Sequence, residues 1–333
     1  MPHQTCKHAV NAVAGLVAAA VISLSGPVAA QQWPTGPVTM IIPFAAGGPT
    51  DVLGRIVGER MGTSLGQQVI IENVGGAGGM TGASRGARAK PDGNTFVLGT
   101  VGTHAMNQSL YAKPAYDAAT DFQPVILIAQ LPIMLLTKPG LPATDMKSFM
   151  EYVKSNKGKV NFASAGAGSA THLACVLFNA AAGLEAAHVA YRGTGPAMND
   201  LVGGQVDYMC EIVSTALPQV QANAVKGLAL FDTKRSPVLP DMATADEQGL
   251  KGFEAYTWNA IFLPNGTPAA IAGKLHDAVE EAMNDAGVAK RLGELGASVV
   301  GPDKRSADYL AKFVTSEIAK WAKPIKDSGA KVE

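Results

Sequence analysis

The sequence has no surplus of charge of either sign and little cysteine. It contains 333 residues, with 27 Lys and Arg against 27 Asp and Glu, and three cysteines. A balanced chain lacks the basic surface that attracts nucleic acid or anionic membranes, so we expect neither partner. Three cysteines are too few for a disulfide-stapled small domain, and a chain of this length buries a core without such staples.

Long hydrophobic runs are also missing. No apolar stretch reaches the ~20 residues that a membrane-spanning helix needs. The stretch Ala12–Leu24 follows a weakly basic start at Lys7, and Gly26-Pro27 and the small residues 28–30 follow it. This pattern is typical of a secretory signal peptide, so we predict that residues 1–30 are removed by cleavage after Ala30. The alternative is an uncleaved membrane anchor, which the shortness of the stretch disfavours.

Two cysteines remain after the predicted cleavage, Cys175 and Cys210. Both stand in apolar stretches, which favours two separate, small buried side chains. A disulfide is the alternative, because exported proteins fold in an oxidising compartment.

Apolar runs alternate with helical patterns along the chain. Strand-like runs lie at 38–44, 68–74, 95–100, 125–137, 160–163, 188–191, 206–212, 225–231 and 256–263. Helical patterns lie at 51–65, 80–89, 147–155, 172–182, 196–202, 268–284, 288–295 and 307–325. The alternation predicts an α/β fold with mainly parallel sheets covered by helices. No low-complexity linker divides the chain, which favours two domains that share strands.

Four turns have one design, in which an apolar strand ends in small residues and a helix follows. They read IPFAAGGPTD (42–51), LGTVGTHAMN (98–107), FASAGAGSATH (162–172) and VAYRGTGPAMND (189–200). In open α/β sheets, ligands bind beyond the carboxyl ends of the strands, where helix N-termini offer free N–H groups. The turns therefore favour a shared anion site. Ordinary βα connections with N-caps are the alternative for each turn taken alone.

Familiar enzyme motifs fit poorly. Gly47-Gly48-Pro49-Thr50 has no following Lys for a nucleotide triphosphate, and glycines 76, 78 and 82 have the wrong spacing for a dinucleotide. Ser84 stands in a GxSxG sequence, but within a helical pattern rather than directly after a strand. The histidines at 104, 172, 188 and 276 have no metal-ligand spacing. We expect no cofactor, no metal and no catalytic residue.

Charged and histidine side chains near these turns remain candidates for ligand contact. Asp51 opens the first helix, where it either caps the helix or borders the site. Arg192 is a candidate clamp for a carboxylate, with a solvated surface position as the alternative. Glu211 lies near a strand end and is a candidate acceptor for a polar ligand group. His104 stands at a strand end, where ligand contact and solvent exposure are both open.

Several long stretches in one order resemble the Bug-type receptors of tripartite tricarboxylate transporters. They include WPTGPVTMIIPFAAGGPTD, GQQVIIENVGGAGGMTGA, KPDGNTFVLGT, GKVNFASAGAGSATHLA, HVAYRGTGPAMNDLVGGQVDYM and KRSPVLPDMATADEQGLKGFEA. The resemblance runs from about Trp33 to the C-terminus. It implies a two-domain periplasmic binding protein fold of type II that closes on a small carboxylate. It also implies a monomeric periplasmic receptor that delivers this ligand to membrane permease subunits.

The resemblance also implies a domain division and a site. The division is residues 31–130 with 245–333 for one domain and 131–244 for the other. The expected ligand-binding residues are Phe44, Ala45, Gly47, Gly48, Asp51, Thr103, His104, Ser164, Ala165, Gly166, Ser169, Thr171, Tyr191, Arg192, Gly193, Glu211 and Trp258.

The chain departs from the family pattern near this site. Cys210, Glu211 and Ile212 replace a common Phe-Asp-Asn, and VAYRG replaces a common VPYKG. The ligand therefore need not be the family's commonest one. Two other functions stay open at this point: an exported hydrolase that uses Ser84 or Ser164 with His172, and a receptor-fold protein that senses a ligand rather than delivering it.

Overall fold

The computed structural model describes residues 33–332. The predicted signal peptide, residues 1–30, lies outside the described residues. Contacts divide the chain between Thr35 and Gly36, and the fold below is that of the unit that begins at Gly36.

The strands form one mixed sheet in the order β2-β1-β3-β9-β4-β7-β5-β6, and β8 and β10 also pair with β4. Most strands are buried runs rich in Val, Ile and Leu, as expected of a sheet covered on both faces. Their bounds are β1 (Val38–Ile42), β2 (Val69–Asn73), β3 (Thr95–Thr100), β4 (Phe122–Thr137), β5 (Asn161–Ser164), β6 (Ala187–Ala190), β7 (Tyr208–Ile212), β8 (Lys226–Leu230), β9 (Tyr256–Pro264) and β10 (Ser298–Val299).

Strand β4 joins two halves of the sheet. Its residues 122–132 pair with β9, and its residues 133–137 pair with β7 and β8. We call β2, β1, β3, β9 and β10 the first half, and β7, β5, β6 and β8 the second half. Strands β1, β2 and β3 are parallel, as are β5, β6 and β7, and every antiparallel pairing between the named strands involves β4 or β9.

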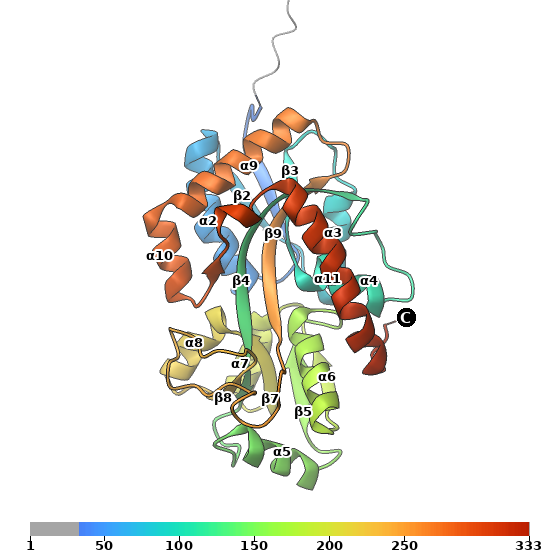
Figure 1. The fold of residues 1–333 in the computed structure, drawn as a ribbon, viewed down its shortest axis with the longest axis vertical. Helices are drawn as coiled ribbons and strands as arrows, with labels where there is room; N and C mark the ends of the chain where they lie inside the picture. The colour runs from blue at the N-terminus through green and yellow to red at the C-terminus, as the bar shows by residue number, and fades with distance from the viewer. Residues whose placement is uncertain (1–32, 333) are drawn as a thin grey trace, which may run out of the picture. The chain divides into compact units, whose positions relative to one another are not determined.

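Helices cover both faces of each half. Figure 1 shows α2, α9 and α10 on one side of the first half, with α3, α4 and α11 on the other. In the second half, α7 and α8 lie opposite α6. The bounds are α2 (Pro49–Leu65), α3 (Met80–Ala87), α4 (Asn107–Leu110), α5 (Met146–Ser155), α6 (Ala170–Ala182), α7 (Thr194–Val202), α8 (Val213–Gln221), α9 (Ala269–Asn284), α10 (Ala286–Glu294) and α11 (Ala307–Asp327).

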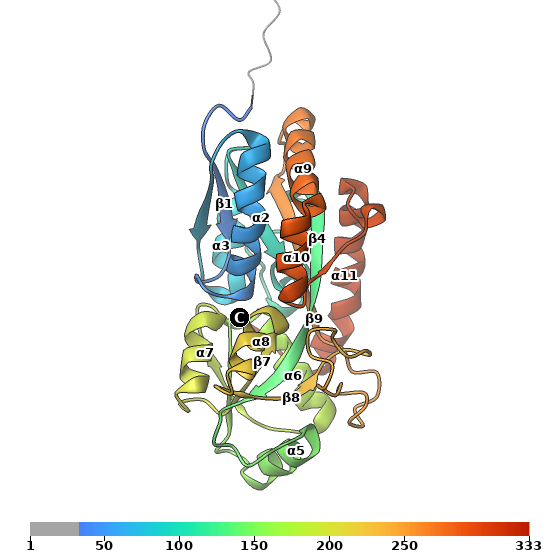
Figure 2. The ribbon, with the colours of Figure 1, turned by 90° about the vertical axis from the view of Figure 1, so that its left-hand side faces the viewer.

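Local sequence explains many helix ends. Pro49 starts α2, where its missing N–H costs nothing, and Gly66 ends that helix with a left-handed φ of 65°. Ser169 caps α6 by accepting a hydrogen bond from the His172 N–H. The turns after β1, β5 and β6 thus deliver the starts of α2, α6 and α7 to the boundary between the two halves. Figure 2 shows β4 running across this boundary, with α2 on one side of it and α7 and α8 on the other.

The cysteines are paired, so the prediction of separate side chains is wrong. Cys175 of α6 and Cys210 of β7 form a disulfide, with their Cα atoms 5.4 Å apart. The prediction failed because helix α6 packs directly on strand β7, which brings together two buried residues that are 35 positions apart in the chain.

Candidate functional site

The turns that follow β1, β5 and β6 meet at a small cavity between the two halves of the sheet, and β7 ends beside it. Its volume is about 20 Å³, which is room for about one water molecule. The lining residues are Phe44, Gly48, Pro49, Thr50, Thr100, Ala165, Ser169, Ala170, Thr171, Thr194, Ile212 and Thr257. A ligand of several heavy atoms therefore enters only if these walls move apart.

The cavity lining combines apolar surface with hydroxyl groups and carries no charge. Its hydroxyl-bearing residues are Thr50, Thr100, Ser169, Thr171, Thr194 and Thr257, and no lining residue has an ionisable side chain. The first turns of α2, α6 and α7 reach it, and first-turn amides have no acceptor within their own helix. Each helix start also carries a partial positive charge of about half a unit. This arrangement suits an oxyanion held by N–H and O–H donors.

The bare turn after β1 uses two of its amides for its own structure. The Ala45 N–H donates to the carbonyl of Arg192 at 3.1 Å, and the Gly47 N–H donates to Asp51 Oδ2 at 2.9 Å. We predicted both residues as ligand contacts. The first of these bonds instead ties the first half of the molecule to the second, while Phe44 and Gly48 of the same turn line the cavity.

Asp51 stabilises this turn from behind. Burial raises the pKa of its carboxyl, but hydrogen bonds from Arg55, Gly47 and Asn73 outweigh that effect and the net pKa is lowered. Asn73 also donates to the Phe44 carbonyl at 3.1 Å. Asp51 is therefore an ionised brace of the turn, outside the cavity lining.

The turn after β5 contributes Ala165, Ser169 and Thr171 to the cavity. The Thr171 hydroxyl accepts a hydrogen bond from the Ala165 N–H at 3.0 Å, and it lies 3.1 Å from the Ser169 hydroxyl. Gly166 approaches the first half closely, because a Cβ there would lie 3.1 Å from the Gly78 nitrogen. A bulkier side chain at this glycine would hold the two halves apart.

Ser164 lies behind this turn and pairs with a histidine other than the expected one. Its hydroxyl is 2.7 Å from His188 Nε2, whereas the exported-hydrolase alternative required His172. Burial lowers the pKa of His188 to about 4 and that of His172 to about 3, with the neighbouring His188 adding to the shift at His172. Among residues 33–332, no carboxylate is hydrogen-bonded to either ring. The pair therefore lacks the orienting acid of a hydrolase triad.

Three predicted residues in the turn after β6 lie around the cavity rather than in its lining. The Tyr191 hydroxyl donates to Asp200, and burial together with that carboxylate raises the pKa of Tyr191 to about 12. Arg192 is exposed and contributes its backbone carbonyl to the contact with Ala45. Gly193 packs so closely that a Cβ would lie 2.8 Å from the Ala45 nitrogen. The residue that follows, Thr194, does line the cavity.

Thr103 and His104 do not line the cavity, because a π-helical turn over Gly102–Met106 carries both side chains into the core. The Thr103 hydroxyl accepts from the Thr100 N–H at 2.9 Å and lies 2.9 Å from His104 Nδ1. The His104 ring stacks on Phe262 at 3.9 Å, and burial lowers its pKa to about 3. His104 is fully buried, which excludes the solvent-exposed alternative, and its contact with a ligand stays a prediction.

Trp258 also points away from the cavity. Its indole N–H donates to Glu317 of α11 at 3.0 Å, and the side chain is fully buried. Side chains alternate along a strand, so the neighbouring Thr257 faces the cavity instead.

Glu211 is fully buried at the end of β7, next to the lining residue Ile212. One carboxyl oxygen accepts a hydrogen bond from the Thr215 hydroxyl at 2.6 Å, and the other has no hydrogen-bond partner of regular geometry among the described residues. Burial raises the pKa of Glu211 to about 7, against the opposing effect of the Thr215 and Thr194 hydroxyls and of the Ile212 backbone N–H. This carboxyl is thus poised to change its charge near neutral pH.

Our sequence reasoning missed several hydroxyl-bearing and backbone contributors to the lining. Thr50, Thr100, Thr194 and Thr257 line the cavity but were not predicted. The sequence carried a signal for Thr50 and Thr194, because each lies in the first turn of a helix that follows a glycine-rich turn. No comparable signal pointed to Thr257.

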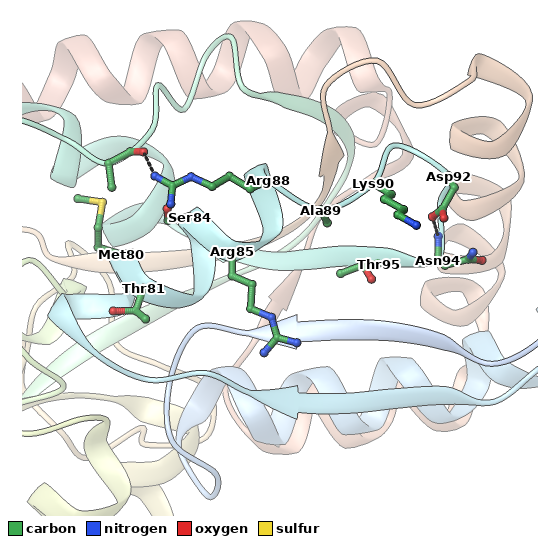
Figure 3. Close-up of a pocket in the computed structure, with 11 residues that line it drawn as sticks. Met80, Thr81, Ser84, Arg85, Arg88, Ala89, Lys90, Asp92, Asn94 and Thr95 are labelled. Atoms are coloured by element: carbon green, nitrogen blue, oxygen red, sulfur yellow. Dashed lines mark hydrogen bonds between the residues drawn. The ribbon is translucent and has the colours of Figure 1, made fainter.

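A wider surface hollow of about 720 Å³ lies along α3 and the turn that precedes β3. Figure 3 shows Ser84 on the α3 helix beside Arg88, whose guanidinium donates to the Ala115 carbonyl. Arg85 extends toward β2, where it pairs with Glu72. Ser84 therefore lies within a helix, as predicted, and not on the sharp strand-to-helix turn that a nucleophile requires.

Comparison with known proteins agrees with this architecture. Residues 53–330 match the model of the tripartite tricarboxylate transporter family receptor. The solved structure of the periplasmic binding protein BugD is 38% identical and covers 90% of this chain and 100% of its own, with a TM-score of 0.87. MatC from Rhodopseudomonas palustris with bound malate is 41% identical, covers 88% and 100%, and has a TM-score of 0.86.

A second R. palustris structure, with adipate, is 34% identical, covers 90% of this chain and 100% of its own, and has a TM-score of 0.85. Among the described residues, no helix is long and apolar enough to cross a membrane. The predicted α/β fold of two-domain periplasmic binding proteins is confirmed, and the similar proteins are solute-binding proteins rather than enzymes. The chain belongs to the family of tripartite tricarboxylate transporter receptors.

Proposed function

We propose that this protein binds a small organic acid in the cavity between the two halves of its sheet and delivers it to a membrane permease of the tripartite type. The observation that carries the proposal is the convergence of three helix starts and six hydroxyl-bearing residues on a cavity without charged lining. Donors of this kind stabilise a carboxylate and do not require a counter-charge.

Similar proteins support the choice of a carboxylate. MatC holds malate and the other R. palustris structure holds adipate, both of which are small dicarboxylates. We propose that a carboxylate of the ligand meets the starts of α2, α6 and α7. Of the predicted contacts, Phe44, Gly48, Ala165, Ser169 and Thr171 lie in the lining, and we add Thr194 and Thr257 to that proposed set.

The binding cycle requires opening and closing, because the cavity of about 20 Å³ is far smaller than a dicarboxylate. We propose residues 31–130 with 245–333 as one lobe and residues 131–244 as the other. Strands β4 and β9 then connect the lobes and serve as the hinge, and the ligand favours the closed state to the extent that it contacts both lobes.

The remaining expectations stay part of this proposal. The chain is exported by a signal peptide cleaved after about Ala30, acts as a monomer in the periplasm, and meets permease subunits there. Uptake rather than sensing is the proposed role, on the strength of the family to which the chain belongs.

The test is thermal unfolding of the ligand-stripped mature protein against mono-, di- and tricarboxylates, aromatic acids, amino acids and amides. A ligand at about a thousand times its Kd adds about 4 kcal/mol of stability, which raises Tm by several degrees. We expect a shift with carboxylates and none with the matched amides. A Thr171→Val variant, which removes a hydroxyl from the lining, should show a smaller shift, whereas Ser84→Ala, in the surface hollow, should match the unmodified protein.

Shifts with amides equal to those with acids would contradict a carboxylate site. Failure of every acid to shift Tm would contradict the receptor function as proposed.

A further inference from the structure

Glu211 lies directly behind the cavity wall. The next residue, Ile212, is part of the lining, and so is Thr194, whose hydroxyl is near enough to the carboxyl to favour its ionised form. The Thr194 hydroxyl and one Glu211 oxygen are both buried without a hydrogen-bond partner of regular geometry among the described residues. Buried polar atoms rarely remain unpaired in folded proteins, so these two point to an interaction that a ligand completes.

No charged side chain offsets Glu211. The segment of β4 that pairs with β7 and the helix α8 carry no ionisable residue, and α7 carries only Asp200, which accepts the Tyr191 hydroxyl. On β7 and just before it, Asp207 pairs with Lys138, and Tyr208 donates to Asn179. No neighbouring charge therefore compensates for a change in the charge of the Glu211 carboxyl, and burial raises its pKa to about 7.

The protonation state of Glu211 decides what the Thr194 hydroxyl presents to the cavity. An ionised carboxyl is only an acceptor, so the hydroxyl turns its hydrogen toward Glu211 and offers the cavity an acceptor oxygen. A protonated carboxyl donates to the Thr194 oxygen, which frees the hydroxyl hydrogen to donate into the cavity. A carboxylate ligand is repelled in the first state and bound in the second.

We propose that Glu211 takes up a proton when a carboxylate enters the cavity, and that Thr194 transmits this change to the ligand. The inference rests on the proposed function, since it assumes an acidic ligand in this cavity. Glu211 is a positioning residue here, because it acts through Thr194. Glu211 also discriminates between classes of ligand. An acid that places a carboxylate oxygen next to Thr194 binds with proton uptake. A ligand that places an ammonium group there leaves Glu211 ionised.

The pKa values of the two histidines and of Asp51 near the cavity lie below the range of pH 6 to 8.5. The pKa values of His172 and His188 are lowered by burial to about 3 and about 4, and the pKa of Asp51 is lowered by its hydrogen bonds despite burial. Dicarboxylates such as malate and adipate are also largely ionised over this range. A pH effect on affinity in this window is therefore assignable to Glu211.

The experiment is calorimetric titration of the mature protein with the best acid from the thermal panel, from pH 6 to 8.5. At pH 7 to 7.5, two buffers of different ionisation enthalpy report the number of protons taken up. We expect uptake of up to one proton and a Kd that weakens by up to about tenfold per pH unit above pH 7. Glu211→Gln, which mimics the protonated state, should bind with a Kd that changes less than twofold over this range.

Two further variants keep the proposal testable if Glu211→Gln folds poorly. Thr194→Val should bind the acid more weakly at low pH, and its pH dependence should be smaller than that of the unmodified protein. Glu72→Gln, which removes an acid that pairs with Arg85 beside the distant surface hollow, should retain the full pH dependence.

Binding without proton uptake and with a flat pH profile would overturn the role of Glu211 and leave the receptor function standing. Persistence of proton uptake in Glu211→Gln would overturn it as well. The absence of binding by every acid at every pH would overturn both proposals.

Discussion

Glu317 receives three hydrogen bonds from side chains of β9 and of its own helix, α11. The Tyr256 hydroxyl donates to it at 2.8 Å, and the indole N–H groups of Trp258 and Trp321 donate at 3.0 Å each. The carboxyl is only 4% exposed. These bonds satisfy its charge in the core and fasten the C-terminal helix to the central strand of the sheet.

Removing this carboxyl should destabilise the fold. Glu317→Ala leaves two buried indole donors and the part-buried Tyr256 hydroxyl without this acceptor, and we expect a loss of about 3–5 kcal/mol in the free energy of unfolding. Urea denaturation measures this loss. Glu317→Gln is the matched control, because it retains one carbonyl acceptor and should lose less. A loss below about 1 kcal/mol for Glu317→Ala would show that water replaces the carboxyl without cost.

At the residue scale, the sequence did not indicate which way a side chain points. Thr257 and Trp258 are neighbours on one strand, and only the packing of α11 against β9 decides which of them faces the cavity. The burial of His104 was not foreseen for a similar reason, since a π-helical turn cannot be read from GTHAM. Small and hydroxyl residues in turns were easier to predict, because strand ends and helix starts fix their position.

At the scale of elements, the two halves of the molecule touch through glycine turns. A Cβ on Gly75 would lie 2.5 Å from the Arg192 carbonyl, and one on Gly78 would lie 2.1 Å from the Ala167 carbonyl. The Tyr111 hydroxyl bridges the same two regions by donating to the carbonyls of Ala77 and Ala167. The backbones of these turns can therefore approach so closely only because glycine has no side chain.

A methyl group at Gly193 should oppose closure of the halves. This glycine has an extended backbone with φ of 162°, so alanine is tolerated locally, but its Cβ would lie 2.8 Å from the Ala45 nitrogen. We expect Gly193→Ala to weaken ligand binding by about 1–3 kcal/mol, which is about 5- to 150-fold in Kd. Calorimetric titration with the best acid of the panel gives the Kd.

Gly140→Ala is the matched control for this prediction, because a Cβ there meets nothing within 4 Å. It should bind the acid as the unmodified protein does. Equal affinity of both variants would mean that the ligand-bound state does not need the contact between Gly193 and Ala45.

Most elements were predictable because their hydrophobic patterns are strong and local. The strand Thr95–Thr100 and the helix Ala307–Asp327 were predicted to within a few residues. The helix Val213–Gln221 was missed, since it carries Pro218 in its interior and directly follows a strand. Pairing between strands was harder to foresee, because β9 enters the sheet between β3 and β4 only through contacts distant in sequence.

At the scale of the whole molecule, the disulfide between Cys175 and Cys210 constrains the unfolded chain. It closes a loop of 35 residues within the second half of the sheet. Such a loop lowers the entropy of the unfolded ensemble, with a stabilising effect of about 3–4 kcal/mol in the chain-entropy description. The bond also agrees with export to an oxidising compartment.

Loss of the disulfide should therefore lower stability without abolishing ligand binding. We expect the double variant Cys175→Ala with Cys210→Ala to unfold at a Tm lower by several degrees, measured by thermal denaturation. Affinity for the acid should change less than twofold, because neither cysteine lines the cavity. An unchanged Tm would show that the disulfide does not lower the conformational entropy of the unfolded chain.

The position of β9 has a consequence for how the chain is made. Residues 256–264 lie between β3 and β4 in the sheet, although both neighbours are synthesised more than a hundred residues earlier. Until the last quarter of the chain emerges, β3 and β4 lack the strand that joins them, and the first half has an open gap at its centre. We therefore expect the first half of the sheet to complete its folding only after residues 256–264 have been synthesised.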